Sequence, residues 1–110
     1  MSETVCSKIK LRPGSLGRVR EWAAEMNRRA DEALATLRDE GVIIESVFLD
    51  STAEGDFLIF YMKAEDFERA RAVGRASAHP IDAYHHQFQR ETFESGKRLE
   101  LLFDLNGSRS

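Results

Sequence analysis

An unbroken apolar run, Phe57–Met62 (FLIFYM), constrains the fold of this 110-residue chain more than any other feature. A β-strand with one buried face alternates apolar and polar residues, whereas a strand covered on both faces is apolar throughout. The run is far too short to span a membrane, which takes about 20 residues. We therefore expect a central strand of a sheet that is covered on both sides.

Three other segments predict strands around this one. Thr4–Arg12 and Lys97–Leu105 each alternate apolar residues with mostly polar ones, and this is the pattern of a half-buried strand. Val42–Asp50 precedes the apolar run and is separated from it by the turn-rich Ser51–Asp56. A hairpin is the simplest interpretation of that pair.

Apolar residues spaced by three and four predict three helices. The first is one long helix, Leu16–Glu40, capped by Gly41, and the second begins at Glu65. His79-Pro80 ends the second helix, because proline disfavours a helical conformation in the residue before it. The third helix is Ile81–Glu94, ended by Gly96.

The order β-α-β-β-α-(α)-β predicts an α+β, ferredoxin-like fold with a four-stranded antiparallel sheet and helices on one face. We expect one domain over residues 1–105 and a flexible tail over 106–110. The helices leave one face of the sheet bare, although Phe57, Ile59 and Tyr61 all point to it. Leaving such residues in water forfeits roughly 1.5–3 kcal/mol each. A second copy of the sheet is the expected cover, and the third helix folding underneath is the alternative.

The charge and cysteine content of the chain limit the kinds of partner and compartment that we expect. The net charge is −3 with acids and bases interspersed, so neither nucleic acid nor an anionic membrane is expected to bind. Cys6 is the only cysteine, which excludes an internal disulfide and suits a reducing compartment. The first ten residues lack the apolar core of a signal peptide. We expect a cytoplasmic protein.

Three stretches, LGRVREWAAEM, ALATLRDEGVIIESVFLD and AHPIDAYHHQF, are similar to a small bacterial family with no assigned activity. With the doubly apolar strand, they also make the chain resemble the dimeric α/β-barrel superfamily. That superfamily includes cofactor-free monooxygenases, haem-degrading enzymes, sugar mutarotases and ligand-sensing modules. The resemblance implies a homodimer joined through its sheets and leaves the chemistry open, because fold does not fix function.

All three histidines of the chain fall within eight residues, in HPIDAYHH. His85 lies on the apolar stripe of the third helix, and Asp82 is one turn before it. One hypothesis makes His85 an acid/base catalyst that Asp82 orients, with His79 assisting. The alternative is a helix start, in which Asp82 favours the helix dipole and His85 is a half-buried core residue. These three residues match no established metal motif, so we expect no metal and no cofactor, although the resemblance leaves haem ligation open.

Polar or aromatic residues near the sheet are candidate ligand-binding groups: Tyr61, Trp22, Glu45 and Lys10. If the dimer forms, some polar strand residues face its interior, and we then expect Lys8 or Lys10 to pair with Glu45 or Glu100. Trp22 lies at the border of its helical stripe and would wall a pocket if it turned toward His85. The sequence thus favours a domain that binds or converts a small organic molecule by proton transfer beside the third helix. A ligand-sensing or structural homodimer and a cofactor-free monooxygenase are the alternatives.

Overall fold

The computed structural model describes residues 2–108 and contains four helices and four strands. In chain order these are β1 (Glu3–Leu11), α1 (Leu16–Arg28), α2 (Ala30–Glu40), β2 (Val42–Thr52), β3 (Gly55–Ala64), α3 (Phe67–Ala76), α4 (Pro80–Thr92) and β4 (Phe93–Arg98).

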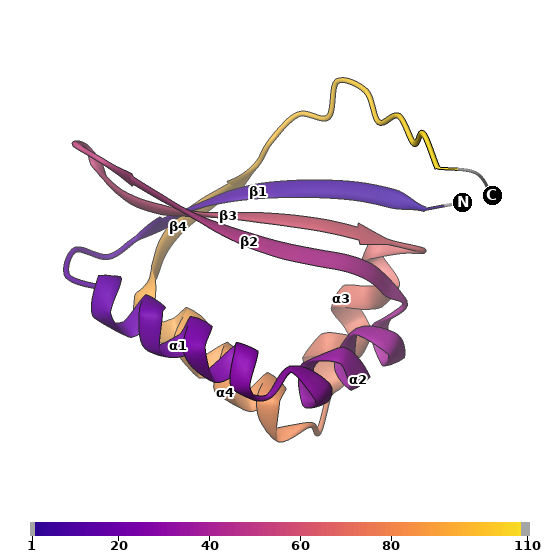
Figure 1. The fold of residues 1–110 in the computed structure, drawn as a ribbon, viewed down its shortest axis with the longest axis horizontal. Helices are drawn as coiled ribbons and strands as arrows, with labels where there is room; N and C mark the ends of the chain where they lie inside the picture. The colour runs from indigo at the N-terminus through magenta and orange to yellow at the C-terminus, as the bar shows by residue number, and fades with distance from the viewer. Residues whose placement is uncertain (1, 109–110) are drawn as a thin grey trace.

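The strands form one antiparallel sheet in the order β2-β3-β1-β4, and the helices cover one of its faces (Figure 1). The predicted α+β, ferredoxin-like fold is therefore confirmed. The face without helices is called the outer face below.

The apolar strand β3 lies inside the sheet, between β2 and β1. Leu58 is 1% exposed and packs in the core under the helices, and Phe60 packs against the same cluster. Their neighbours Phe57 and Ile59 alternate with them and point to the outer face, where the Lys8 ammonium lies 4.4 Å from the centre of the Phe57 ring. The predicted division of this strand between two faces is confirmed.

Two apolar clusters hold the helices to the sheet. The larger joins α1 and α4 to the strands around Trp22, Leu58 and Phe88. The smaller joins α2 and α3 to the opposite end of the sheet around Val42 and Ala70. Each pair of helices is thus held to the sheet by its own apolar cluster.

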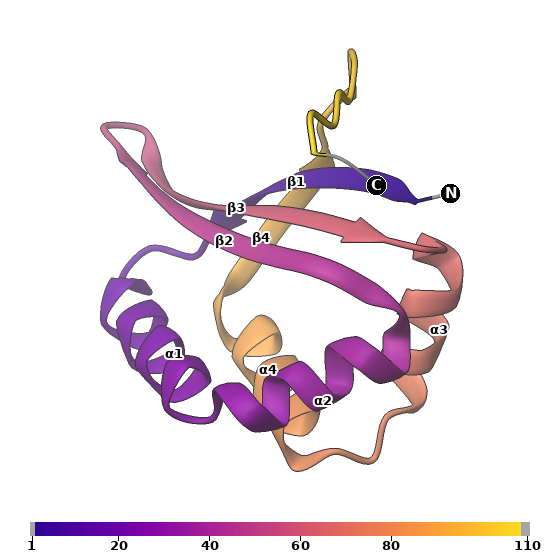
Figure 2. The ribbon, with the colours of Figure 1, turned by 45° about the vertical axis from the view of Figure 1, so that its right-hand side comes forward.

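The prediction of one continuous helix over Leu16–Glu40 is wrong. Arg29 departs from helical geometry with φ −106° and ψ 36°, and it separates α1 from α2. Its guanidinium bonds Glu25 on one side of the break and Glu32 on the other. The apolar spacing continues through the break because both helices bury a stripe, but they bury it against different clusters. Figure 2 shows α1 and α2 meeting at this break.

The prediction of a last strand over Lys97–Leu105 is also wrong in its position. The strand that pairs with β1 is β4, which begins directly after α4. Gly96, expected to end the third helix, lies inside β4, where a Cβ would fall 2.6 Å from Cδ1 of Ile9. Glycine therefore leaves room for the Ile9 side chain in its present position.

Residues 99–105, called the C-terminal arm below, follow β4 and form no strand. Leu99 N–H still donates to the carbonyl of Cys6 at 2.8 Å, and beyond it the arm rises on the outer side of the sheet (Figures 1 and 2). The boundary expected at residue 105 stays a prediction, and residues 109 and 110 of the expected tail lie outside the described residues. No helix within residues 2–108 combines the length and the apolar character needed to cross a bilayer.

Candidate functional site

A cavity of about 640 Å³ lies between the helices and the sheet. All four helices contribute to its wall, because the two apolar clusters close only its ends. Its volume is in the range of small-molecule sites, about 300–1,000 Å³. Four candidate residues from the sequence line it: Trp22, Glu45, Asp82 and His85.

His85 is fixed in the cavity wall by two hydrogen bonds. The indole N–H of Trp22 donates to His85 Nδ1 at 3.1 Å, and the side-chain amide of Gln89 lies 2.9 Å from Nε2. Indole nitrogen is only a donor, so Nδ1 must be the acceptor and Nε2 must carry the proton. The structure places Gln89 Nε2 at that position. Because a protonated His85 Nε2 needs an acceptor, the amide must be turned by about 180° to present its oxygen.

Burial, and to a smaller extent the neighbouring His86, lower the pKa of His85 from 6.5 to about 4, although Asp82 acts in the opposite direction. The ring is therefore neutral at pH 7, with both nitrogens already bonded. Trp22 and Gln89, rather than Asp82, orient it. Trp22 also stacks on the ring at a centroid distance of 5.6 Å, so it walls the cavity from a buried position rather than from the border of its stripe.

We expect His85 to remain neutral from pH 8 down to about pH 4 and to hold its proton on Nε2. Imidazole ¹⁵N and ¹³C shifts measured through a pH titration report both properties. In Trp22→Phe the donor to Nδ1 is gone, so the Nδ1–H tautomer should become populated. A native His85 that titrates near 6.5 would contradict this assignment.

Three carboxyl groups face the other part of the cavity: Glu40 at the end of α2, Glu45 on β2 and Asp82 in the first turn of α4. The charge of Asp82 raises the pKa of both Glu40 and Glu45, and the charge of Glu45 also raises that of Glu40, so the three groups lie close together. Among residues 2–108, none of the three forms an ion pair. Asp82 Oδ2 is buried without a hydrogen-bond partner.

Desolvation and the charge of Asp82 are the main causes that raise the pKa of Glu40 from 4.5 to about 7. The same two causes raise the pKa of Glu45, although its side chain keeps contact with solvent where it lines the cavity. Gly74 on α3 gives Glu40 its room, since a Cβ there would lie 2.9 Å from Glu40 Oε2. The cavity thus holds a carboxyl group that can take up and release a proton near pH 7.

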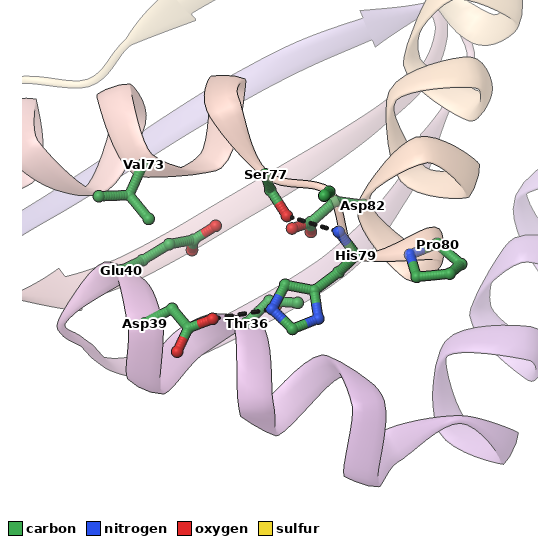
Figure 3. A pocket seen from close by; sticks show the side chains of 9 residues that line it. Thr36, Asp39, Glu40, Val73, Ser77, His79, Pro80 and Asp82 are labelled. Atoms are coloured by element: carbon green, nitrogen blue, oxygen red, sulfur yellow. Dashed lines mark hydrogen bonds and ion pairs between the residues drawn. The ribbon is translucent and has the colours of Figure 1, made fainter.

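A smaller pocket of about 330 Å³ lies between α2 and the connection from α3 to α4. Glu40 and Asp82 also point into this pocket (Figure 3). His79 closes one side of it by bonding Asp39 with its Nε2 at 2.8 Å. His79 therefore lies near Asp82 but does not line the main cavity.

Tyr61 and Lys10 lie elsewhere. Tyr61 pairs with Cys6 across the sheet, on the outer face, and Lys10 forms an ion pair with Glu94 at 3.4 Å. Within residues 2–108, neither Lys8 nor Lys10 pairs with Glu45 or Glu100, so that expectation is wrong. Glu45 points under the helices, whereas both lysines point away. A shift of one residue in strand register would reverse this, and the sequence does not define the register.

Sequence reasoning missed Glu40, Gln89 and the two arginines of α3 that line the cavity, Arg71 and Arg75. Gln89 is one helical turn after His85, and that spacing could have indicated it. Glu40 resembles any acidic residue near a helix end, so no local pattern marks it. Within the part of the chain that the structure describes, no group of three or more potential ligands is arranged to hold a metal ion.

Comparison with solved structures gives several neighbours of the same fold. An L-rhamnose mutarotase from Formosa agariphila superposes with a TM-score of 0.61 at 20% identity, over 94% of this chain and 99% of that one. A putative antibiotic biosynthesis monooxygenase from Bacteroides thetaiotaomicron has a TM-score of 0.61 at 14% identity, over 99% and 95%. A dimeric protein of unknown function with a ferredoxin-like fold, from Bacteroides fragilis, has a TM-score of 0.54 at 18% identity, over 89% and 92%.

At such identities these similarities establish the fold alone, and they agree with the ferredoxin-like fold expected from the sequence. A search of curated proteins finds no significant match. A family model described as a family of unknown function, DUF6176, matches residues 2–109. Almost the whole sequence is covered by that match, and the chain belongs to this family.

Proposed function

We propose that this protein binds a small oxygenated organic molecule in the cavity beside α4 and converts it by proton transfer. One observation carries the proposal: Glu40, Glu45 and Asp82 converge on an open cavity without an ion-pair partner among the described residues. Holding like charges close together in a partly desolvated site is costly, and no ion pair within residues 2–108 offsets that cost for these three groups. Such an arrangement is typical of a functional site.

The chemistry follows from the protonation states. A general acid or base works best when its pKa is near the working pH, and the pKa of Glu40 is about 7. Asp82, with one buried oxygen free, is the group we propose to accept a proton from the ligand, and Glu40 is the group that returns one. His85 is a positioning residue in this proposal, because it is neutral and already bonded at both nitrogens.

Two arginines in the cavity wall favour an anionic or hydroxylated ligand. Arg71 and Arg75 line the cavity from α3, and guanidinium groups bind carboxylates or hydroxyl oxygens. A small hydroxy or keto acid, or a sugar, would thus have its polar end near α3 and its reacting atoms near Asp82. Two structural neighbours are described as a mutarotase and a putative monooxygenase, and the first of these is compatible with proton-transfer chemistry.

We also propose that the protein is a cytoplasmic homodimer joined through the outer faces of its sheets. Phe48 is 61% exposed and Ile44 is 44% exposed on that face, and a contiguous apolar patch usually marks an interface. One structural neighbour is described as dimeric. The free thiol of Cys6 on the same face suits a reducing compartment.

The test uses purified protein in D₂O with a panel of small hydroxy acids, keto acids and reducing sugars. Proton NMR follows C–H exchange and anomeric interconversion, and the fluorescence of Trp22 follows binding. We expect turnover of at least one compound, reduced about 100-fold or more in Asp82→Asn. Tyr61→Phe, outside the cavity, is the matched control and should retain activity.

Binding without turnover in the native protein would favour a ligand-sensing module and contradict the catalytic part of the proposal. Absence of both binding and turnover across the panel would overturn it. Equal turnover by native protein and Asp82→Asn would remove Asp82 from its role.

A further inference from the structure

We propose that the cavity binds an acid that also carries an ammonium group, with its carboxylate at the arginines of α3 and its ammonium at Glu40, Glu45 and Asp82. This inference rests on the proposed function and narrows its ligand class. It starts from a property of the whole cavity. Charged side chains of both signs line it, and within residues 2–108 they form no ion pair with one another.

The basic groups lie where the cavity opens to solvent. Arg71 and Arg75 are one helical turn apart on α3, and both are exposed. Helices α3 and α4 diverge from the connection that joins them (Figures 1 and 2) and pack little against each other. From α4, the half-buried His86 and Gln89 line the cavity. A carboxylate at this opening can bond two guanidinium groups that no acidic side chain occupies.

The acidic groups form a second pole, which the arginines do not neutralise. Glu40 reaches α3 at Gly74, where a Cβ would fall 2.9 Å from its Oε2, yet no arginine of that helix pairs with it within the described chain. The pKa of Glu45 is raised by desolvation and by Asp82, and neither arginine offsets that rise. One oxygen of Asp82 is buried without a hydrogen-bond partner. Each pole is therefore open to a ligand group of the opposite charge.

An ammonium group fits the acidic pole better than a hydroxyl group or a metal ion does. It carries three N–H donors and a positive charge, whereas a hydroxyl has one donor and leaves the like charges uncompensated. It bonds oxygens at about 2.8 Å, a longer reach than the roughly 2.1–2.4 Å of magnesium or calcium. The longer reach matters because, in the described chain, these carboxyl groups are not arranged closely enough to hold a metal ion.

Binding of an ammonium group should release a proton from Glu40. Charged groups on several elements act on this side chain: Asp39 on α2, Glu45 on β2, His79 in the connection from α3 to α4, and Asp82 on α4. Of these only His79 lowers its pKa, which remains about 7, so Glu40 is roughly half protonated at pH 7. A cation placed beside it favours the ionised form. Up to about half a proton should therefore leave per ligand bound.

Isothermal titration calorimetry on the native protein tests this with two matched series. The first consists of linear ω-amino acids with three to six carbons, and the second of ω-hydroxy acids of the same lengths, which share the anionic end. Titrations in PIPES and in TES, buffers that differ in ionisation enthalpy, give the number of protons released. We expect at least one amino acid to bind about ten-fold or more tightly than its hydroxy counterpart. It should release protons at pH 7 and almost none at pH 8.5, where Glu40 is mostly ionised already.

Variants assign the two ends of the ligand. Asp82→Asn should remove most of the preference for the amino acid, and Glu40→Gln should abolish the proton release. Arg71→Gln should weaken both members of a pair about ten-fold and leave their ratio unchanged. Arg69→Gln lies on the same helix but outside the cavity, so this matched control should bind both series like the native protein. The proton release of the native protein tests the inference even if a cavity variant fails to fold.

The outcomes separate this inference from the proposed function. Hydroxy acids that bind as tightly as the amino acids, or proton uptake when the amino acids bind, would overturn the inference, and C–H exchange in the hydroxy acids would leave the proposed function intact. Tight binding of an amino acid with proton release but without C–H exchange would support the inference and contradict the catalytic part of the proposed function. Absence of binding in both series would overturn the inference, whereas turnover of a sugar would still support the proposed function.

Discussion

Phe88→Ala is expected to lower the free energy of unfolding by about 3–5 kcal/mol, the range for removing a fully buried aromatic ring. Phe88 is 0% exposed. Its ring stacks on Trp22 at a centroid distance of 4.3 Å with an interplanar angle of 2°, and it contacts Phe93 edge-on. Because helices α1 and α4 are joined to the sheet through this cluster, the structure has little freedom to close the space left behind.

Urea unfolding followed by the fluorescence of Trp22, the only tryptophan, measures the loss. Phe88→Leu, which refills most of the volume, should cost clearly less than Phe88→Ala. Leu34→Ala on the exposed side of α2 should change stability by about 0.5 kcal/mol or less. If Phe88→Ala costs no more than this control, the α1–α4 cluster does not stabilise the fold as described.

Glu40→Gln should stabilise the protein at pH 8 by about 1–2 kcal/mol and leave stability unchanged below pH 4.5. The pKa of Glu40 is about 7 in the folded chain and 4.5 when unfolded. Since the folded state resists ionisation, native stability falls as pH rises from 4.5 to 7. Glutamine imitates the protonated side chain and avoids that loss. A shift of this size corresponds to about 3 kcal/mol if fully expressed, and partial exposure of Glu40 to solvent reduces it.

Unfolding free energies measured from pH 4 to pH 9 test this difference. Glu54→Gln, at an exposed turn position between β2 and β3, is the matched control and should follow the native curve within about 0.5 kcal/mol. His85 acts in the opposite direction, because its lowered pKa makes native stability fall as pH drops from 6.5 to 4. The sign of the Glu40→Gln effect is therefore clearest above pH 7. A uniform gain at all pH values would exclude titration of Glu40 as its cause.

The fold could be predicted from the sequence because the apolar run in β3 requires a central strand that is covered on both faces. That requirement holds whatever the exact bounds of the other elements. Helix breaks are a weaker signal. Arg29 has no proline or glycine beside it, and the apolar spacing continues across it, so the division between α1 and α2 depends on which cluster each half contacts. The strand at Phe93–Arg98 was hidden for a similar reason: it is a short edge strand of mostly exposed residues.

The candidate site was predicted in part. HPIDAYHH indicated the helix that lines the cavity, and His85, Asp82, Trp22 and Glu45 do line it. The sequence does not predict which group titrates near neutrality. Desolvation and repulsion among Glu40, Glu45 and Asp82 arise only where α2, β2 and α4 meet. The catalytic and binding roles themselves stay predictions.

The interruption at Arg29 has a mechanical consequence. Ala23 and Met26 line the cavity from one side of it, and Thr36 and Leu37 line it from the other. In the part of the cavity wall formed by α1 and α2, two helices thus meet at one non-helical residue, and each packs against a separate cluster. A change in φ and ψ at Arg29 would alter the angle between α1 and α2, and with it the width of the cavity. Ligands of different width would then fit without the loss of any hydrogen bond inside either helix.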